Sequence, residues 1–212
     1  MTLVGYWPLN EENGDTAYDY SGNENHGGLE GNPTQGANGV VGGNAYEFDG
    51  DDDYVETIFQ PDSDNDVWSL SFWVYVNEPH EWAVGHFAED TRIYISNAHG
   101  WRLGDGRVEG DGDFLRENDF SVGEWSHLVL VGDGSMSRAY VNGDFVGEDS
   151  YSWSGSTNNL LLGAINSDSP DDFLDGVIDD VRIYNRALTP AEIQYLYNVS
   201  RRGRFVSRKK QP

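Results

Sequence analysis

The sequence contains no cysteine, so neither disulfide bonds nor a thiolate-bound metal can stabilise the fold. It has no run of about 18 apolar residues, which excludes a membrane-spanning helix. Its first residues, MTLVGYWPLN, include neither a basic leader nor the apolar segment of a signal peptide. We therefore expect a soluble chain without a signal peptide and without membrane insertion. Heptad repeats and long amphipathic stretches are also lacking, which argues against a coiled coil.

Cations are scarce in the body of the chain, and lysine is absent before Lys209. The chain has 13 Lys and Arg residues against 37 Asp and Glu residues, a formal net charge of −24. Six of the cations lie in the last twelve residues, so residues 1–198 hold seven cations against all 37 acids, a charge of about −30. Such a body repels itself at low ionic strength, and we interpret it as adaptation to high salt; an ordinary acidic protein is the alternative. It also lacks the basic surface that a nucleic-acid partner would require.

The chain ends in a basic segment, RRGRFVSRKKQP, and we predict a single domain over residues 1–200 followed by this tail over 201–212. A disordered, solvated tail is one interpretation. The other is an anchor in which arginines pair with carboxylates of a second copy or of another structural protein, which predicts a homo-oligomer or a larger assembly. The cations assigned to this anchor are Arg201, Arg202, Arg204, Arg208, Lys209 and Lys210.

Glycine and aromatic residues are abundant, with 26 Gly, 12 Tyr, 9 Phe and 7 Trp, and short β-branched or aromatic runs alternate with turn residues. Apolar residues occupy every second position of Val67–Val76, which predicts a strand of a packed sheet with Trp68 and Phe72 in the core. The pair Asn142-Gly143 between apolar runs predicts a type I′ hairpin. The fold class predicted from these patterns is all-β, a two-sheet antiparallel sandwich with one short C-terminal helix.

The last part of the body, DGVIDDVRIYNRALTPAEIQYLY, predicts a strand and then a capped helix over roughly Pro190 to Asn198. Thr189 and Glu192 form a capping box, and proline suits the first helical position. Simple alternation along the strand places Asp179 on the apolar side with Val181, where an unpaired charge is costly.

Five segments follow one another along the chain: GYWPLNEENGDTAYDYSGNENHGG, AYEFDGDDDYVE, LSFWVYV, WSHLVLVGDGSMSRAYVNGDFVGE and DGVIDDVRIYNRALTPAEIQYLY. In this order they resemble the signature blocks of laminin G-like domains of the concanavalin A-like lectin/glucanase superfamily. The region from about Asn77 to Glu124 resembles them loosely, and the segment after Ser200 does not. The resemblance implies a jelly-roll sandwich, usually non-catalytic, that binds sugars or proteins and often one calcium ion.

The resemblance also implies where a calcium ion, Ca2+, would lie. Calcium takes six to eight oxygen ligands and accepts carbonyls readily. The carboxylate would come from Asp179, and carbonyls would come from the turn and the first strand: Asp49, Gly50, Trp7, Pro8 and Leu9. The alternative is that Asp179 accepts hydrogen bonds from backbone N–H groups without any metal.

Catalytic motifs are not found. Asp62–Asp66 resembles the start of an EF-hand loop, but Val67 and Trp73 stand where that loop needs glycine and glutamate. Glu109–Asp113 resembles the catalytic strand of laminarinase-type hydrolases, but its glycines favour a turn. The five histidines are scattered without metal-ligand spacing. We therefore predict that the chain is not an enzyme.

Sugar binding on such sheets uses exposed aromatic rings, although most aromatic residues of a sandwich belong to its core. The carbohydrate-binding candidates are Trp73, Tyr75, Trp82, Tyr94 and Trp101, with Trp82 and Trp101 favoured. The function predicted is a non-catalytic glycan-binding or adhesion module at a virion or cell surface, hence extracellular, in high salt. The alternative is a structural assembly protein of a capsid, tail or surface layer that uses the jelly roll for protein contacts; a glycoside hydrolase is less supported.

Overall fold

The computed structural model describes residues 2–41, 43–60, 67–77, 82–88, 91–96, 100–104, 121–149, 159–164, 170 and 172–207. For 82–88, 91–96, 100–104, 149 and 201–207 it describes the backbone alone.

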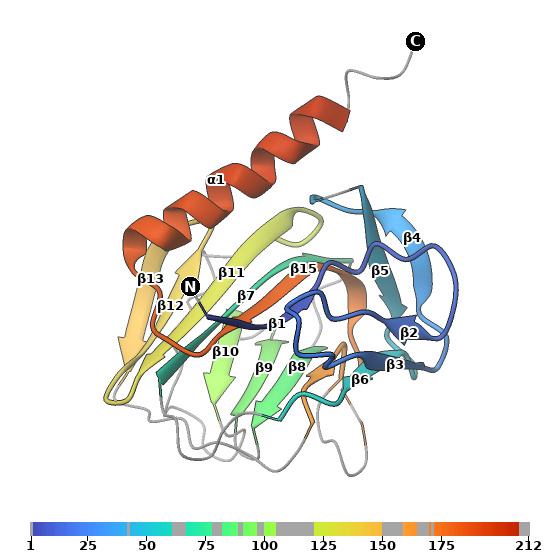
Figure 1. Cartoon of the computed structure of the whole chain (residues 1–212), viewed down its shortest axis with the longest axis horizontal. Coiled ribbons are helices and arrows are strands. Elements are labelled where there is room, and N and C mark those ends of the chain that lie inside the picture. Colours follow the sequence, from blue (N-terminus) through green and yellow to red (C-terminus); the bar gives the residue numbers. More distant parts are fainter. Residues whose placement is uncertain are drawn as a thin grey trace.

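Two antiparallel sheets pack face to face (Figure 1). The larger, which we call the large sheet, has eight strands within the described residues. Their order is β13 (Asp144–Asp149), β12 (Ser137–Val141), β11 (Trp125–Asp133), β7 (Val67–Val76), β15 (Asp175–Tyr184), β5 (Asn44–Asp49) and β4 (Thr34–Asn38), with β1 (Leu3–Trp7) also paired to β15. The small sheet has seven strands in the same described ranges, in the order β10 (Gly100–Gly104), β9 (Thr91–Ser96), β8 (Trp82–Ala88), β14 (Leu161–Leu162), β6 (Tyr54–Thr57), β3 (Gly27–Glu30) and β2 (Thr16–Ala17). The predicted all-β sandwich is confirmed.

The core lies between the sheets, and strand β7 shows how the sequence builds it. Its alternate residues, from Trp68 through Phe72 to Val76, belong to the main cluster of buried apolar side chains. Both predicted core aromatics are therefore confirmed. Residues Ser69, Ser71 and Trp73 point to the opposite face of the large sheet, which we call its outer face, and they too are buried. Because these side chains are buried although they point away from the core, another element of the chain must cover this part of the outer face.

The cover is helix α1 (Pro190–Ser207), which runs across β11, β12 and β13 in Figure 1. Ile193 and Leu196 pack on Val129, Val131 and Tyr140 of the outer face. The predicted capping box is confirmed, because the Thr189 N–H donates to Glu192 Oε2 at 2.9 Å and the Glu192 N–H donates to Thr189 Oγ1 at 3.3 Å. Among the described residues, no helix is both long and apolar enough to cross a membrane.

The predicted end of this helix near Asn198 is wrong. The Asn198 side chain donates from Nδ2 to the carbonyl of Gln194 at 2.8 Å, so it bonds within the helix and does not cap it. The helix continues to Ser207 and includes Arg201, Arg202 and Arg204. Residues 208–212, with the other cations of the predicted tail, lie outside the described part of the chain.

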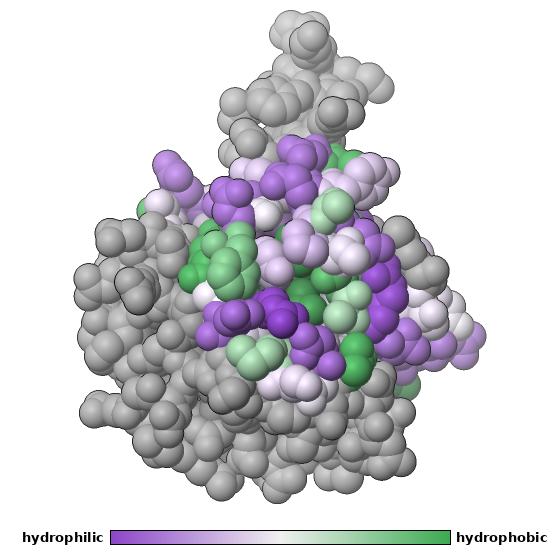
Figure 2. Space-filling model, turned by 90° about the vertical axis from the view of Figure 1, so that its left-hand side faces the viewer, coloured by the Kyte–Doolittle hydropathy of each residue, from purple (hydrophilic) through white to green (hydrophobic). Residues whose placement is uncertain are grey.

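The hairpin between β12 and β13 turns at Asn142 and Gly143, both with positive φ (54° and 89°), as a type I′ turn requires. The prediction for this turn is confirmed. Figure 2 shows the side of the molecule on which β12, β13 and the start of α1 lie. Over its described part, hydrophilic and hydrophobic residues intermingle, so this side presents a mixed surface.

Strand β15 departs from simple alternation. Its pairing with β7 shifts between Asp179 and Arg182, and Asp180 has a φ of 54°. This β-bulge places both aspartates on the outer face, while Ile178 and Val181 on either side of them point into the core. The prediction that Asp179 shares a face with Val181 is therefore wrong, because an extra residue resets the alternation.

Candidate functional site

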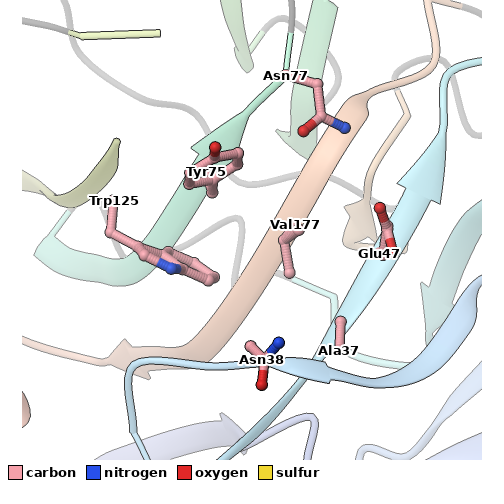
Figure 3. Close-up of a pocket in the computed structure, with 7 residues that line it drawn as sticks. All are labelled: Ala37, Asn38, Glu47, Tyr75, Asn77, Trp125 and Val177. Carbon is pink, nitrogen blue, oxygen red and sulfur yellow. The ribbon is translucent and has the colours of Figure 1, made fainter. Parts of the chain in front are cut away.

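A pocket of about 300 Å³ lies on the outer face of the large sheet, beside the area that α1 covers. Figure 3 shows Tyr75 and Trp125 on one side of it, Glu47 on the other and Val177 between them. Its volume is at the lower end of the range for small-ligand sites. The described residues that line it are Ala37, Asn38, Glu47, Tyr75, Asn77, Trp125 and Val177.

Strand register arranges four of these side chains in one row. Trp125 is paired with Tyr75, Tyr75 with Val177, and Val177 with Glu47. Directly paired residues on neighbouring strands point to the same face, and the strands lie about 4.8 Å apart. The row therefore runs across β11, β7, β15 and β5 for roughly 14 Å. We call it the pocket row.

The two aromatic rings of the pocket row are partly exposed. Their centroids lie 5.9 Å apart and their planes meet at 60°, an edge-to-face contact that fixes both rings. Val177 is also partly exposed and adds an apolar floor. The pocket therefore offers a firm apolar surface that water still reaches.

Polar groups surround this apolar surface. Glu47 and Asn38 are exposed on strands β5 and β4. Asn77 is held in place, because its Nδ2 donates to Asp175 Oδ1 at 2.7 Å and its backbone N–H donates to the Asp175 carbonyl at 3.1 Å. An apolar floor bordered by amides and a carboxylate can hold a molecule with one apolar face and several hydroxyl groups.

The predicted sugar-binding aromatics fall into three groups. Tyr75 lines the pocket. Trp73 lies on the same face but is only 3% exposed, and it stacks on Tyr197 of α1 with centroids 5.7 Å apart. Its prediction as a sugar contact is wrong, because the helix covers the ring. Trp82 and Trp101 are both paired with Ile95 in the small sheet, while Tyr94 lies one residue before it; their side chains lie outside the described part.

Sequence reasoning missed Trp125, Glu47, Asn38 and Asn77. A signal existed for the first, since an aromatic residue at the start of a strand comes to lie beside Tyr75 once β11 pairs with β7. The two acidic segments that resemble an EF-hand loop and a hydrolase strand, Asp62–Asp66 and Glu109–Asp113, lie outside the described residues.

Asp179 is fully buried near the pocket. Its Oδ2 accepts hydrogen bonds from the backbone N–H groups of Val40 and Val41, at 2.6 and 2.7 Å, and its Oδ1 has no partner. Burial raises the pKa of this carboxyl to about 8. The side chain thus ties the loop between β4 and β5 to β15. We call this contact the Asp179 clamp.

The loop that Asp179 holds is close to the pocket, because β4 carries Ala37 and Asn38. Gly39 leaves room for the clamp, since a Cβ at this position would lie 2.7 Å from Asp179 Oδ2 and would overlap the carbonyl oxygen of Asn44. Any larger side chain here would push the loop away from β15.

Asp180 has a different partner. It is 2% exposed, and its Oδ1 accepts a hydrogen bond from Arg182 Nη2 at 2.8 Å. The guanidinium of Arg182 also lies over the Tyr6 ring, 4.9 Å from its centroid. The two adjacent aspartates therefore have different partners: backbone N–H groups bind Asp179, and the half-buried guanidinium of Arg182 binds Asp180.

The predicted calcium ligands do not meet at one site. Asp49 is paired with Asp175, four residues before Asp179 on β15, which corresponds to roughly 13 Å along the strand. Trp7 is paired with Val181, beyond the bulge. Asp179 and the Asp49-Gly50 turn therefore lie apart, and the site that combines them is not formed.

Asp49 belongs instead to a group of three carboxylates with Asp52 and Asp53, whose ligand oxygens lie within 4.8 Å of one another. Burial, and then the neighbouring Asp49, raise the pKa of Asp53. A cation would relieve the repulsion among these groups. The three carboxylates could hold a metal ion.

The two packed sheets define a β-sandwich domain, and the sequence comparison identifies its family. Residues 49–194 match the laminin G-type model of the concanavalin A-like lectin/glucanases superfamily. The chain belongs to this superfamily. No curated protein matches it in sequence.

Solved structures show the same fold at low identity. Domain 4 of AbnA, a GH43 extracellular arabinanase from Geobacillus stearothermophilus in complex with arabinotriose, is 21% identical with a TM-score of 0.67, over 92% of this chain and 98% of that one. The botulinum neurotoxin serotype D binding domain is 14% identical with a TM-score of 0.70, over 93% of this chain and 52% of that one. The Trypanosoma rangeli sialidase in complex with sialic acid is 16% identical with a TM-score of 0.69, over 92% of this chain and 32% of that one. This chain thus spans nearly all of the arabinanase domain, about half of the toxin domain and about a third of the sialidase.

Proposed function

We propose that the chain is a non-catalytic glycan-binding module whose ligand occupies the pocket on the large sheet. The observation that carries the proposal is the pocket row, in which Trp125, Tyr75 and Val177 form an apolar floor that ends at Glu47. A sugar ring has an apolar C–H face that fits such a floor and hydroxyl groups that bond with carboxylates and amides. The arabinotriose bound to the similar arabinanase domain supports this ligand class.

Binding is favoured over hydrolysis by the number of carboxylates. Glycoside hydrolysis uses a pair of acids about 5–9 Å apart across the scissile bond. Among the described residues that line the pocket, Glu47 is the single carboxylate. The pocket therefore has the means to recognise a sugar, and the nearest second acid, Asp175 at its rim, is engaged in a hydrogen bond with Asn77.

Replacing Trp125 by alanine should lower glycan affinity at least tenfold, because central aromatic contacts are typically worth 2 kcal/mol or more and about 1.4 kcal/mol is tenfold. A glycan array followed by calorimetry, with arabinotriose as the first soluble ligand, measures this. The matched control is Tyr195→Ala, which removes a ring that is 64% exposed on α1. Equal affinities of Trp125→Ala and the parent for the bound glycan would refute the site.

We also propose that the cation of the Asp49, Asp52 and Asp53 group is calcium. The group offers oxygen ligands alone, which suit a hard cation. The turn that carries it connects β5, a strand of the pocket row, to β6 of the small sheet. Calcium would then stabilise the edge of the sandwich and would not touch the ligand.

We further propose that the module works outside the cell, at a cell or virion surface, in a salt-rich medium. The acidic composition, with a net charge of −24, supports the salt-rich setting. The similar arabinanase domain comes from an extracellular protein, which supports the location.

A second candidate function is assembly through protein contacts, and the length of α1 favours it. The described side chains by which α1 packs on the large sheet, those of Ile193, Leu196 and Tyr197, precede Ser200, yet the helix continues to Ser207 and carries three arginines there. A chain that ends at Ser200 should therefore keep its melting temperature. If these arginines pair with acids of a second copy, the same truncation should convert oligomers to monomers in light scattering; unchanged oligomers would refute the anchor.

A further inference from the structure

We infer that the pocket rejects glycans that carry carboxylate or sulfate groups, an inference that rests on the proposed glycan-binding function. The reason is the charge of the pocket. Glu47 contributes a carboxylate, and none of the described lining residues is basic. A second carboxylate, that of Asp175, is hydrogen-bonded to Asn77 at the rim of the pocket.

Asp175 lies two residues before Val177 on β15, so an anionic sugar placed over Val177 would lie close to Glu47 and within a Debye length of Asp175 at moderate salt. Repulsion between groups in contact is screened less than repulsion across a longer distance, so part of it remains when the salt is raised.

Arginine side chains, the usual partners of bound anions, are committed elsewhere in the described part of the chain. Arg138 is paired with Asp133 at 2.6 Å and with Glu148 at 3.0 Å. Arg182 is paired with Asp180 and Arg186 with Glu192. For an anionic glycan to gain one of these three arginines, whose side chains the structure describes, an ion pair would have to break.

The same groups suit neutral hydroxyls. An ionised carboxylate only accepts hydrogen bonds, and its two oxygens can receive two hydroxyl groups of one sugar ring. Asn38 offers both an amide oxygen and an amide nitrogen at the adjacent end of the pocket. A ring over Val177 would therefore lay its apolar face on the floor and direct its hydroxyls toward Glu47, which makes Glu47 the specificity-determining residue.

The test uses an array of neutral, sialylated, uronic and sulfated oligosaccharides, with galactotriose and trigalacturonate as a matched pair that differs only in the charged group of each ring. We expect the full chain to bind neutral glycans and to bind the acidic member of any matched pair at least fivefold more weakly. Glu47→Gln should bring the two members of the pair to within about twofold, because glutamine keeps the shape and removes the charge. Glu30→Gln, which removes an exposed charge from the small sheet, is the control and should leave the ratio unchanged.

The outcomes separate this inference from the proposed function. If no glycan binds, or if Trp125→Ala leaves binding intact, the proposed function fails. If an acidic glycan binds more tightly than its neutral counterpart and Trp125→Ala abolishes that binding, the proposed site stands and the inference that acidic glycans are rejected is overturned. If Glu47→Gln leaves the ratio of the affinities for the neutral and the acidic glycan unchanged, Glu47 does not determine the specificity.

Discussion

Replacing Asp179 by asparagine is expected to raise the melting temperature at pH 8 and to leave it nearly unchanged at pH 4. The amide oxygen of asparagine can accept the same two hydrogen bonds from Val40 and Val41, so the Asp179 clamp is kept. The gain comes from the charge, because burial raises the pKa of Asp179 to about 8 in the folded protein, whereas an aspartate in the unfolded chain has a pKa near 4.

The sign of the pH dependence follows from these two values. Below about pH 4 the carboxyl is protonated in both the folded and the unfolded state, so its ionisation does not change the free energy of unfolding. As the pH rises toward 8 the unfolded state ionises first, so the stability contributed by the folded, protonated carboxyl is progressively lost. With about 1.4 kcal/mol per pKa unit, the loss at pH 8 is on the order of 5 kcal/mol, or roughly 10–20 °C for a domain of this size.

Thermal unfolding at pH 4, 6 and 8 in fixed high salt measures this difference. Asp144→Asn is the matched control, because it makes the same change of side chain at an exposed position. A lower melting temperature of Asp179→Asn at pH 8 would mean that the ionised carboxylate stabilises the fold, and the interpretation of the clamp as a neutral acid would be wrong.

Calcium distinguishes the two aspartate sites. If the ion is held by Asp49, Asp52 and Asp53, then Asp49→Asn should abolish a calcium-dependent rise in melting temperature, and Asp179→Asn should retain it. The opposite pattern would place the ion at Asp179, as the family resemblance implied.

Local sequence patterns predicted the parts of the fold that depend on neighbours in the chain. The alternation of Val67–Val76, the positive φ values of Asn142 and Gly143, and the capping box at Thr189 all follow from a few adjacent residues. The bulge in β15 was not predicted, because aspartate tolerates the left-handed conformation of Asp180 but does not require it. Partners of both aspartates are distant in sequence: the backbone of Val40 and Val41 for Asp179, and the side chain of Tyr6 for Asp180.

The pocket was even less predictable than the bulge from neighbouring residues in the chain. Tyr75 was a candidate because it alternates with core residues on β7, but its partners come from strands far away in the sequence, Glu47 on β5, Trp125 on β11 and Val177 on β15. Their row depends on strand order and register, which short-range patterns do not contain. Trp73 shares the face and the alternation of Tyr75, yet α1 covers it. Which aromatic residue remains accessible is therefore decided by the packing of the last helix.

Lowering the salt from 1 M to 0.1 M is expected to reduce the melting temperature by about 10 °C or more. The screening length grows from about 3 Å to about 10 Å over this range, so carboxylates that are independent in high salt begin to repel one another. Three arginines have side chains that the structure describes, Arg138, Arg182 and Arg186. Each already pairs with a carboxylate, so these cations leave most of the acidic surface unneutralised.

Specific charge repulsion can be separated from general effects of salt on hydrophobic packing. A variant with Glu12→Gln, Glu124→Gln and Asp144→Asn removes three exposed acids without touching the core or the pocket lining. Its melting temperature should fall less than that of the parent in 0.1 M salt and should equal the parent's in 1 M salt. Equal melting temperatures of the parent in both salts would show that the acidic surface is tolerated without screening, and adaptation to high salt would then be the wrong explanation of the missing lysines.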